Sequence, residues 1–280
     1  MTLLQILILA IVQGAAELLP VSSSAHVIVV EKLMGLDPTS PQMTLLLVML
    51  HTGTMFAVIA YFWASWRETY FASMAAFRTQ ALRLVVGTAV TGIVGLALLQ
   101  LIKRLVAGGA DSFEVEHLFG NSRLMATALA AAGLLIIASA RLREGAGDLT
   151  LRSAAWIGAV QGLCLPFRGF SRSGATISTG MILGIARRRA EEFSFALAIV
   201  LTPAVIAKEA YRLVKAHGLT QGPDAVSLWH LAGPSVVGML LSFLAGLVAL
   251  RWLSRWLEQG RWAFFGAYCL LAALVVLRVG

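Results

Sequence analysis

Charged residues are scarce in this 280-residue sequence, and it has only two cysteines. Asp, Glu, Lys and Arg together make up 13% of the chain, whereas soluble domains contain roughly 25%. Hydrophobic residues reach 59%, which is more apolar surface than one globular core could bury. Cys164 and Cys269 both lie in apolar segments and offer neither a disulfide pattern nor metal-ligand spacing. The composition therefore predicts an integral membrane protein, with membrane lipids as partners and no nucleic-acid partner.

Polar linkers and low-complexity tracts are also missing, so we expect a single integral membrane domain over residues 1–280. The N-terminal apolar stretch lacks the basic start of a secretory signal, because the first Lys or Arg is Lys32. Glu17 lies where a cleavage site would follow. We therefore expect this stretch to remain in the mature protein.

Apolar runs of about 20 residues can cross the hydrocarbon core of a bilayer as helices. Six such runs are present, at about 43–65, 84–106, 122–140, 193–211, 231–250 and 262–279. Two more apolar segments, about 3–34 and 153–186, are each broken near the middle by proline and a cluster of hydroxyls. Neither half of a broken segment is long enough to cross alone. We therefore expect two re-entrant helical hairpins, with a kinked full span as the alternative.

Basic residues cluster in alternate loops, which sets the expected orientation of the spans. The basic loops contain Arg67, Arg78, Arg83, Arg141, Arg143, Arg152, Arg187, Arg188, Arg189, Arg251, Arg255 and Arg261. The loop near 107–121 instead carries Asp111, Glu114 and Glu116, with no Lys or Arg. The pattern places the basic loops in the cytoplasm and both termini outside.

With this orientation, the two broken segments enter from opposite sides, and each is followed by three spans. Both begin with the same tripeptide, Val12-Gln13-Gly14 and Val160-Gln161-Gly162. We therefore predict an all-α polytopic membrane protein with six transmembrane helices plus two re-entrant hairpins in an inverted repeat, about 1–140 and 153–280. In such repeats the broken helices meet near the bilayer midplane.

The first break carries ionisable and hydroxyl side chains at membrane depth. Gln13 and Glu17 are four residues apart, so they share a face of the first half-helix, which Pro20 stops. The turn then contains three hydroxyls and an imidazole, Ser22, Ser23, Ser24 and His26. Glu17 indicates function because a charge buried at this depth is costly. Each serine alone is more typical of a helix cap or turn, and His51 in the first span is more typical of helix packing.

The second break contains a guanidinium between two hydroxyls, with glycines on both sides. The stretch runs Gly169-Phe170-Ser171-Arg172-Ser173-Gly174-Ala175-Thr176. A planar cation, hydroxyl donors and a helix N-terminus together suit a phosphate group. The alternative is that Arg172 pairs with Glu17 as a structural salt bridge. Arg168 adds a second positive charge, which could instead reach the interface.

Placed face to face, the two turns would combine a carboxylate, an imidazole, several hydroxyls and an arginine. Such a set can bind an anionic phosphate and activate a nucleophile against it. A secondary transporter or flippase for an anionic, phosphate-containing substrate is the competing hypothesis, because transporters also use inverted repeats with broken helices. A lipid-binding scaffold would need neither Glu17 nor His26 beside the hydroxyls.

The stretches QGAAE, LPVSSSAH and GFSRSGAT resemble the motifs of the bacterial undecaprenyl pyrophosphate phosphatase family, the bacitracin-resistance type. The resemblance covers both broken segments, their spacing and the chain length. One departure is Arg168, which stands where the family motif has proline. The resemblance implies a phosphatase that converts undecaprenyl diphosphate to undecaprenyl phosphate, recycling the lipid carrier for cell-wall synthesis. It also implies a multi-pass protein of the bacterial inner membrane, and it leaves a homodimer open.

On this basis we assign roles to the residues of the two turns. Arg172, with Ser171 and Ser173, is expected to hold the diphosphate. Ser23 is the candidate nucleophile, with His26 or Glu17 as its base, and an activated water is the alternative attacker. The remaining substrate contacts are assigned to Gln13, Ser22, Ser24 and Thr176. The resemblance also suggests a divalent cation, Mg²⁺ with Ca²⁺ as the alternative, held largely by the diphosphate and touched by Glu17.

Overall fold

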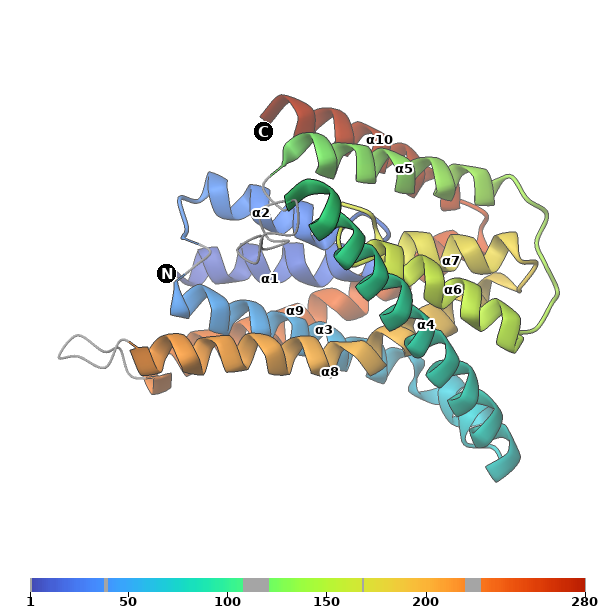
Figure 1. Cartoon of the computed structure of the whole chain (residues 1–280). Helices are drawn as coiled ribbons and strands as arrows, with labels where there is room; N and C mark the ends of the chain where they lie inside the picture. Colours follow the sequence, from blue (N-terminus) through green and yellow to red (C-terminus); the bar gives the residue numbers. More distant parts are fainter. Residues whose placement is uncertain (1, 38–39, 108–120, 168, 220–227, 280) are drawn as a thin grey trace. The chain divides into compact units, whose positions relative to one another are not determined.

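The computed structural model describes residues 2–37, 40–107, 121–167, 169–219 and 228–279. Within these ranges the chain forms helices and no named strand (Figure 1). In chain order the helices are α1 (Leu3–Leu18), α2 (Ser23–Leu33), α3 (Pro41–Tyr70), α4 (Met74–Ala107), α5 (Ser122–Ala140), α6 (Leu151–Cys164), α7 (Arg172–Ile182), α8 (Arg187–Leu219), α9 (Leu228–Glu258) and α10 (Trp262–Val279). The predicted all-α class is confirmed.

Four helices are long and apolar enough to cross a bilayer. They cover Met43–Tyr70, Met74–Leu105, Ser122–Ala140 and Gly233–Glu258. These helices match four of the six predicted spans and support a membrane protein. The other two predicted spans, 193–211 and 262–279, are helical in α8 and α10. Among the described residues, Trp262–Arg278 is apolar but shorter than these four helices, and α8 is not one of the four. Most of the acidic loop, residues 108–120, lies outside the described residues.

Both broken segments leave the helical conformation where proline and hydroxyl residues predict a break. The first break separates α1 from α2, and Ser22 within it has a φ of 66°. The second break separates α6 from α7, and Gly169 within it has a φ of 104°. Positive φ is unfavourable for residues with a Cβ atom, so the Ser22 backbone is strained. Both segments are therefore interrupted helices in the structure.

The chain packs as two compact units, and each draws on both halves of the sequence. The first unit contains Met1–Leu18, Ser23–Phe62 and Ala198–Trp252, and the second contains Leu19–Ser22, Trp63–Leu197 and Leu253–Gly280. The single-domain organisation with two repeats stays a prediction.

In the first unit, α1 and α2 pack on the N-terminal half of α3. The buried residues of this core are Ile6, Leu9, Ala10, Val27, Met43, Leu46 and Leu50. Helix α9 approaches α1 through small residues, because a Cβ atom at Gly14 would lie 2.8 Å from the carbonyl oxygen of Ser242. The Ser242 hydroxyl in turn donates to the carbonyl oxygen of Leu50 at 2.9 Å, which ties α9 to α3. Small residues allow the close helix contacts that are common inside membranes.

In the second unit, α4 and α6 are in similarly close contact. A Cβ atom at Gly158 would lie 2.2 Å from the carbonyl oxygen of Gly87, so only glycine fits at this crossing. Between the backbones, the Thr91 hydroxyl lies 2.8 Å from the Gly87 oxygen and 2.9 Å from the Gly158 oxygen. Gln161 of the second tripeptide donates to Thr91 at 3.3 Å. Gln161 is therefore part of the helix contact.

Helix α7 is held by α5 and α10, which lie side by side (Figure 1). The indole nitrogen of Trp262 donates to the hydroxyls of Ser139 and Ser178, both at 3.1 Å. These two hydroxyls are also hydrogen-bonded to each other at 2.9 Å. Trp262 and both serines are fully buried. This polar network fixes the helix that follows the second break.

Candidate active site

The last turn of α1 and the first residue of α2 bring three polar side chains together. The Ser23 hydroxyl donates to Glu17 Oε2 at 2.6 Å, and Gln13 Nε2 donates to the same oxygen at 3.3 Å. Gln13 is buried, whereas the Glu17 side chain is 23% exposed. The short distance to Ser23 is typical of a hydrogen bond from a hydroxyl to a carboxylate. Glu17 is thus placed to receive the Ser23 proton.

His51 of α3 is the residue that the sequence interpretation did not include in this cluster. Its Nε2 lies 3.8 Å from Glu17 Oε2, and its Nδ1 lies 2.8 Å from the carbonyl oxygen of Leu47. Because a carbonyl oxygen only accepts, Nδ1 must carry a hydrogen, and Nε2 is directed toward the carboxylate. In the sequence, the signal for His51 is that it is an ionisable side chain inside a predicted span. The structure thus places an imidazole beside Glu17.

The other predicted groups of the first turn lie next to this cluster in sequence. Ser22 is buried in the break, and His26 is half-buried on the first turn of α2. The backbone of Ser24 belongs to α2, while its side chain lies outside the described part of the structure. The roles assigned to these three residues stay predictions.

The predicted hydroxyls of the second turn are buried and engaged by the protein. Ser171 caps α7 by accepting from the backbone N–H of Gly174 at 3.2 Å. Thr176 donates to the carbonyl oxygen of Arg172 at 2.8 Å, and its oxygen lies 2.6 Å from the Ser194 hydroxyl. These contacts give the hydroxyls a positioning role at the helix start. Their predicted contacts with substrate stay predictions.

Arg172 is the first residue of α7, and its side chain is half-buried. Its guanidinium carbon lies 5.9 Å from the ring centroid of Phe195 on α8. A guanidinium over an aromatic face is attracted by the ring and is held in orientation. The backbone N–H groups at a helix N-terminus also favour anions. The Arg172 guanidinium and the N-terminus of α7 would therefore both attract an anionic group. Arg168 lies outside the described residues.

Within the second unit, the first break packs against the start of α7. The Ser173 hydroxyl donates to the carbonyl oxygen of Leu19 at 3.3 Å. A Cβ atom at Gly174 would lie 3.1 Å from the Pro20 side chain, and Cys269 donates to the Pro20 carbonyl oxygen at 3.2 Å. These contacts join the first break to the helix that follows the second break, and the inverted repeat itself stays a prediction. Joint action of Glu17 and Arg172 on one substrate stays a prediction.

The donor set of the Glu17 cluster fits a hard divalent cation only in part. Among the described residues no group of three His, Cys, Asp or Glu side chains could hold a metal ion. Glu17 offers a carboxylate, and the Gln13 side chain, whose amide nitrogen donates to Glu17, also carries an amide oxygen. Oxygen ligands suit Mg²⁺ and Ca²⁺, but one carboxylate leaves most positions to other donors. The cluster can therefore contact a cation that a diphosphate brings.

Comparisons with known proteins cover almost the whole chain. The family model of the bacitracin resistance protein BacA matches residues 6–275. A protein of Acinetobacter baylyi named undecaprenyl-diphosphatase 2 is 64% identical over 280 residues, which cover 100% of this chain and 98% of the relative. Undecaprenyl-diphosphatase 2 of Burkholderia thailandensis is 34% identical over 293 residues, covering 99% of this chain and 96% of the relative. The chain therefore belongs to the bacitracin resistance protein BacA family.

Proposed function

We propose that this protein dephosphorylates undecaprenyl diphosphate to undecaprenyl phosphate in the membrane, with Ser23 and Glu17 as its central catalytic pair. The family membership and the two relatives named undecaprenyl-diphosphatase support the reaction. The observation that carries the choice of residues is the 2.6 Å hydrogen bond from Ser23 to Glu17. A hydroxyl on a carboxylate is the arrangement by which a weak nucleophile is activated. The product is the monophosphate carrier that cell-wall synthesis uses, and the family name implies bacitracin resistance.

The reaction proceeds by attack of Ser23 Oγ on the terminal phosphorus. A bond forms between Oγ and phosphorus, and the bond from phosphorus to the bridging oxygen breaks, which releases undecaprenyl phosphate. The Ser23 proton passes to Glu17, which accepts it at Oε2. Water then hydrolyses the phosphoserine, releasing inorganic phosphate and restoring the serine. The alternative, a water that Glu17 activates directly, gives the same products without a covalent intermediate.

Arg172 supplies the positive charge on which phosphoryl transfer depends. Its planar fork can donate two parallel hydrogen bonds to the oxygens of one phosphoryl group. Phe195 holds the guanidinium from one side, and Thr176 fixes the first turn of α7. Charge on the equatorial oxygens grows in the transition state, so a preoriented cation lowers the barrier more than a mobile one.

Two histidines are further candidates for roles in the reaction. His51 lies beside Glu17 and limits the directions that the carboxylate can take. His26 follows Ser23 on α2 and remains the second candidate for the base. Mg²⁺, or Ca²⁺ in its place, would be contacted by Glu17 and the Gln13 amide oxygen and would supply further charge neutralisation on the diphosphate.

We further propose six spans and two re-entrant hairpins in an inverted repeat, in the inner membrane. Two features support it. The helices repeat in order, with 11 residues in both α2 and α7, 30 in α3 and 33 in α8, and 34 in α4 and 31 in α9. Helix α4 carries Gly87, Thr91 and Gly95 at four-residue spacing, and α9 carries Gly238, Ser242 and Gly246. Each trio includes residues that contact a broken segment. Gly87 and Thr91 of α4 contact α6, and Ser242 of α9 contacts α1.

The deciding experiment is phosphate release from undecaprenyl diphosphate by the purified full-length protein in detergent. No gradient exists there, so transport cannot register. We expect turnover by the native sequence and its loss in Glu17→Gln. Thr52→Val is a matched control, because the Thr52 hydroxyl donates to Val48 of its own helix at 2.8 Å. Absence of phosphate release by the native protein, or equal rates in all three proteins, would refute the proposal.

A further inference from the structure

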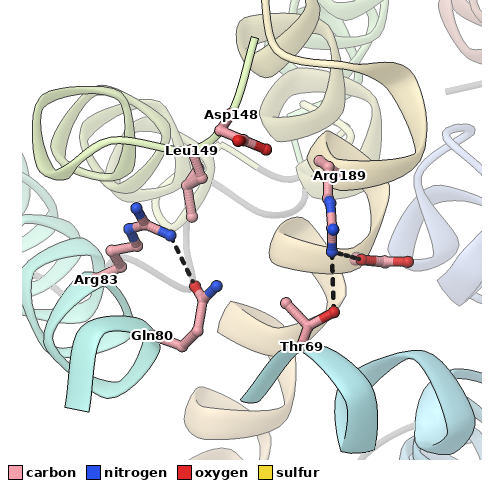
Figure 2. Close-up of a pocket in the computed structure, with 7 residues that line it drawn as sticks. Thr69, Gln80, Arg83, Asp148, Leu149 and Arg189 are labelled. Carbon is pink, nitrogen blue, oxygen red and sulfur yellow. Dashed lines mark hydrogen bonds and ion pairs between the residues drawn. The ribbon is translucent and has the colours of Figure 1, made fainter. Parts of the chain in front are cut away.

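A polar cavity of about 220 Å³ lies within the second unit, and none of the residues assigned to catalysis lines it. It is formed by the end of α3, the starts of α4 and α8, and the segment before α6 (Figure 2). The polar side chains that line it are Thr69, Gln80, Arg83, Asp148, Arg189 and Glu192. The proposed chemistry uses none of them, so the cavity needs an explanation of its own.

One wall of the cavity is a fixed guanidinium. Arg189 Nη1 donates to the Thr69 hydroxyl at 2.9 Å and to Glu192 Oε2 at 3.3 Å (Figure 2). Buried Glu192 also accepts from Arg188 at 3.2 Å and from the Ser65 hydroxyl. Two arginines therefore share one carboxylate, which leaves this wall with excess positive charge. Arg189 is oriented before any ligand arrives.

The opposite wall carries a second guanidinium from another helix. Arg83 Nη1 donates to the amide oxygen of Gln80 at 3.2 Å, and both residues lie on α4 (Figure 2). Across the described residues, no carboxylate is within ion-pair distance of Arg83. Paired guanidinium groups on one cavity are the usual means of holding a phosphate, since each can donate through a planar fork.

A third wall presents a carboxylate. Asp148 lies above the space between Arg83 and Arg189 in Figure 2. Its backbone is fixed, because the N–H of neighbouring Gly147 donates to the Gly184 carbonyl oxygen at 3.0 Å and the Gly147 carbonyl oxygen accepts from the Ala186 N–H at 3.1 Å. The Asp148 carboxylate makes no ion pair within the described part of the chain. Two cations and one carboxylate on separate walls match a ligand that carries a phosphate and an ammonium group.

Neighbouring aromatic residues indicate that the cavity lies at the level of lipid headgroups. Exposed Trp63, Phe71 and Phe77 form a cluster at the junction of α3 and α4, with ring centroids 6.2 and 5.8 Å apart. Aromatic residues gather at membrane–water interfaces, and Arg67 and Arg78 nearby are exposed. The basic loops predict that this end is cytoplasmic. The ligand is therefore to be sought among the lipids of that leaflet.

We propose that the cavity binds the headgroup of a zwitterionic phospholipid of the phosphatidylethanolamine class. The phosphate lies between Arg83 and Arg189, and the ammonium group contacts Asp148. A phosphate alone would leave the Asp148 carboxylate beside an anion, and this disfavours purely anionic headgroups. The site is independent of the phosphatase reaction, because it shares no residue with it.

The test counts lipids that remain bound to the purified full-length protein in native mass spectrometry. Phosphatidylethanolamine and phosphatidylglycerol are added separately. We expect Arg83→Gln to weaken binding of both lipids, roughly tenfold as for a lost charge-assisted hydrogen bond. Asp148→Asn should weaken the binding of phosphatidylethanolamine by a similar factor. Binding of phosphatidylglycerol should stay unchanged or become stronger. Arg78→Gln is the matched control, because it removes an exposed arginine of the same helix outside the cavity.

Equal losses in Arg83→Gln and Arg78→Gln would show general charge attraction and overturn the proposal. So would an unchanged lipid preference in Asp148→Asn. Soluble competitors separate a lipid from a free ion. We expect O-phosphoethanolamine to displace the bound lipid, whereas equally effective displacement by inorganic phosphate would assign the cavity to free phosphate instead. None of these readouts depends on phosphate release, so failure of the proposed function would leave them interpretable.

Discussion

The Ser23 hydroxyl donates a 2.6 Å hydrogen bond to Oε2 of Glu17 across the break between α1 and α2. Pro20 ends the first helix and Ser22 turns the chain with a positive φ, so the two residues meet although six positions separate them. The strained backbone at Ser22 is therefore part of how the catalytic pair is assembled.

Ser23→Ala should reduce turnover of undecaprenyl diphosphate by on the order of a thousandfold or more, because the nucleophile is lost. Binding of the lipid diphosphate should persist, since Arg172 and α7 are unchanged. Rates of phosphate release and equilibrium binding of the substrate check the two statements. Labelled phosphate should be trapped on the native protein and not on the variant.

Ser22→Ala serves as the comparison, because it removes a neighbouring hydroxyl that we do not assign to attack. Substantial turnover in Ser23→Ala together with its loss in Ser22→Ala would identify a different nucleophile. Full activity in both variants would favour water as the attacker.

Arg172→Lys should lower kcat/KM by roughly a hundredfold, although it preserves the charge. Lysine lacks the planar fork that lies over the Phe195 ring, so it cannot donate two parallel hydrogen bonds to one phosphoryl group. Steady-state kinetics with the lipid diphosphate measures the loss. Arg188→Lys is a control at the exposed start of α8 and should stay near the native rate. If both variants behave alike, Arg172 does not clamp the phosphate.

Much of this architecture could be predicted from the sequence, because the determining forces are local. Pro20 and the serines after it break the first segment, and apolar runs of about 20 residues mark the spans. Gln13 and Glu17 were expected on one face of a helix, and the structure places them within hydrogen-bonding distance. These predictions depend only on spacing along one element.

Contacts between distant elements could not be predicted in the same way. His51 lies 34 positions after Glu17, and nothing in its neighbours Thr52 and Gly53 indicates which helix it faces. Arg83 and Arg189 share a cavity because α4 and α8 begin close together, which no local pattern encodes. Thr176 is predicted to bind substrate, but the structure also places its hydroxyl against Ser194. That contact depends on how α7 packs on α8, which the local sequence does not encode.

Gly158→Ala should destabilise the protein, because the new methyl group would lie 2.2 Å from a backbone oxygen of Gly87. Overpacking of this kind costs about 1–3 kcal/mol. Thermal unfolding in detergent provides the measurement. Gly92→Ala is the matched control on α4, since a Cβ atom there meets nothing within 4 Å. Equal melting temperatures for the two variants would contradict the close contact of α4 and α6.

Opposite ends of α5 should be accessible from opposite sides of the membrane. Single cysteines at Arg123 and Arg143, both exposed, can be introduced after Cys164 and Cys269 are replaced by alanine. The positive-inside rule predicts labelling of position 143 from the cytoplasm and of position 123 from outside. An impermeant thiol reagent applied to intact cells and then to opened cells distinguishes the two. Labelling of both positions in intact cells would contradict the predicted orientation.

Glu191 should make the stability of the protein depend on pH. It lies at the start of α8, two positions before the predicted span, and accepts from the Ser254 hydroxyl at 2.6 Å. Burial, which outweighs the opposing effect of that hydrogen bond, raises the pKa of Glu191 from 4.5 to about 8, with smaller upward contributions from Glu192 and Glu258 and a downward one from Arg188. The folded protein therefore holds a proton that the unfolded chain releases above pH 4.5.

The stabilisation linked to this proton is complete below pH 4.5 and is lost as the pH rises through about 8. Glu191→Gln mimics the protonated side chain and keeps an oxygen for Ser254, so its melting temperature should fall less between pH 6 and pH 9 than that of the native protein. Glu68→Gln, which changes an exposed carboxylate at the end of α3, should retain the native pH dependence. Thermal unfolding of the three proteins across this range decides the matter. Parallel curves for all three would mean that Glu191 is already ionised in the folded state, since a permanently charged group cannot contribute a slope.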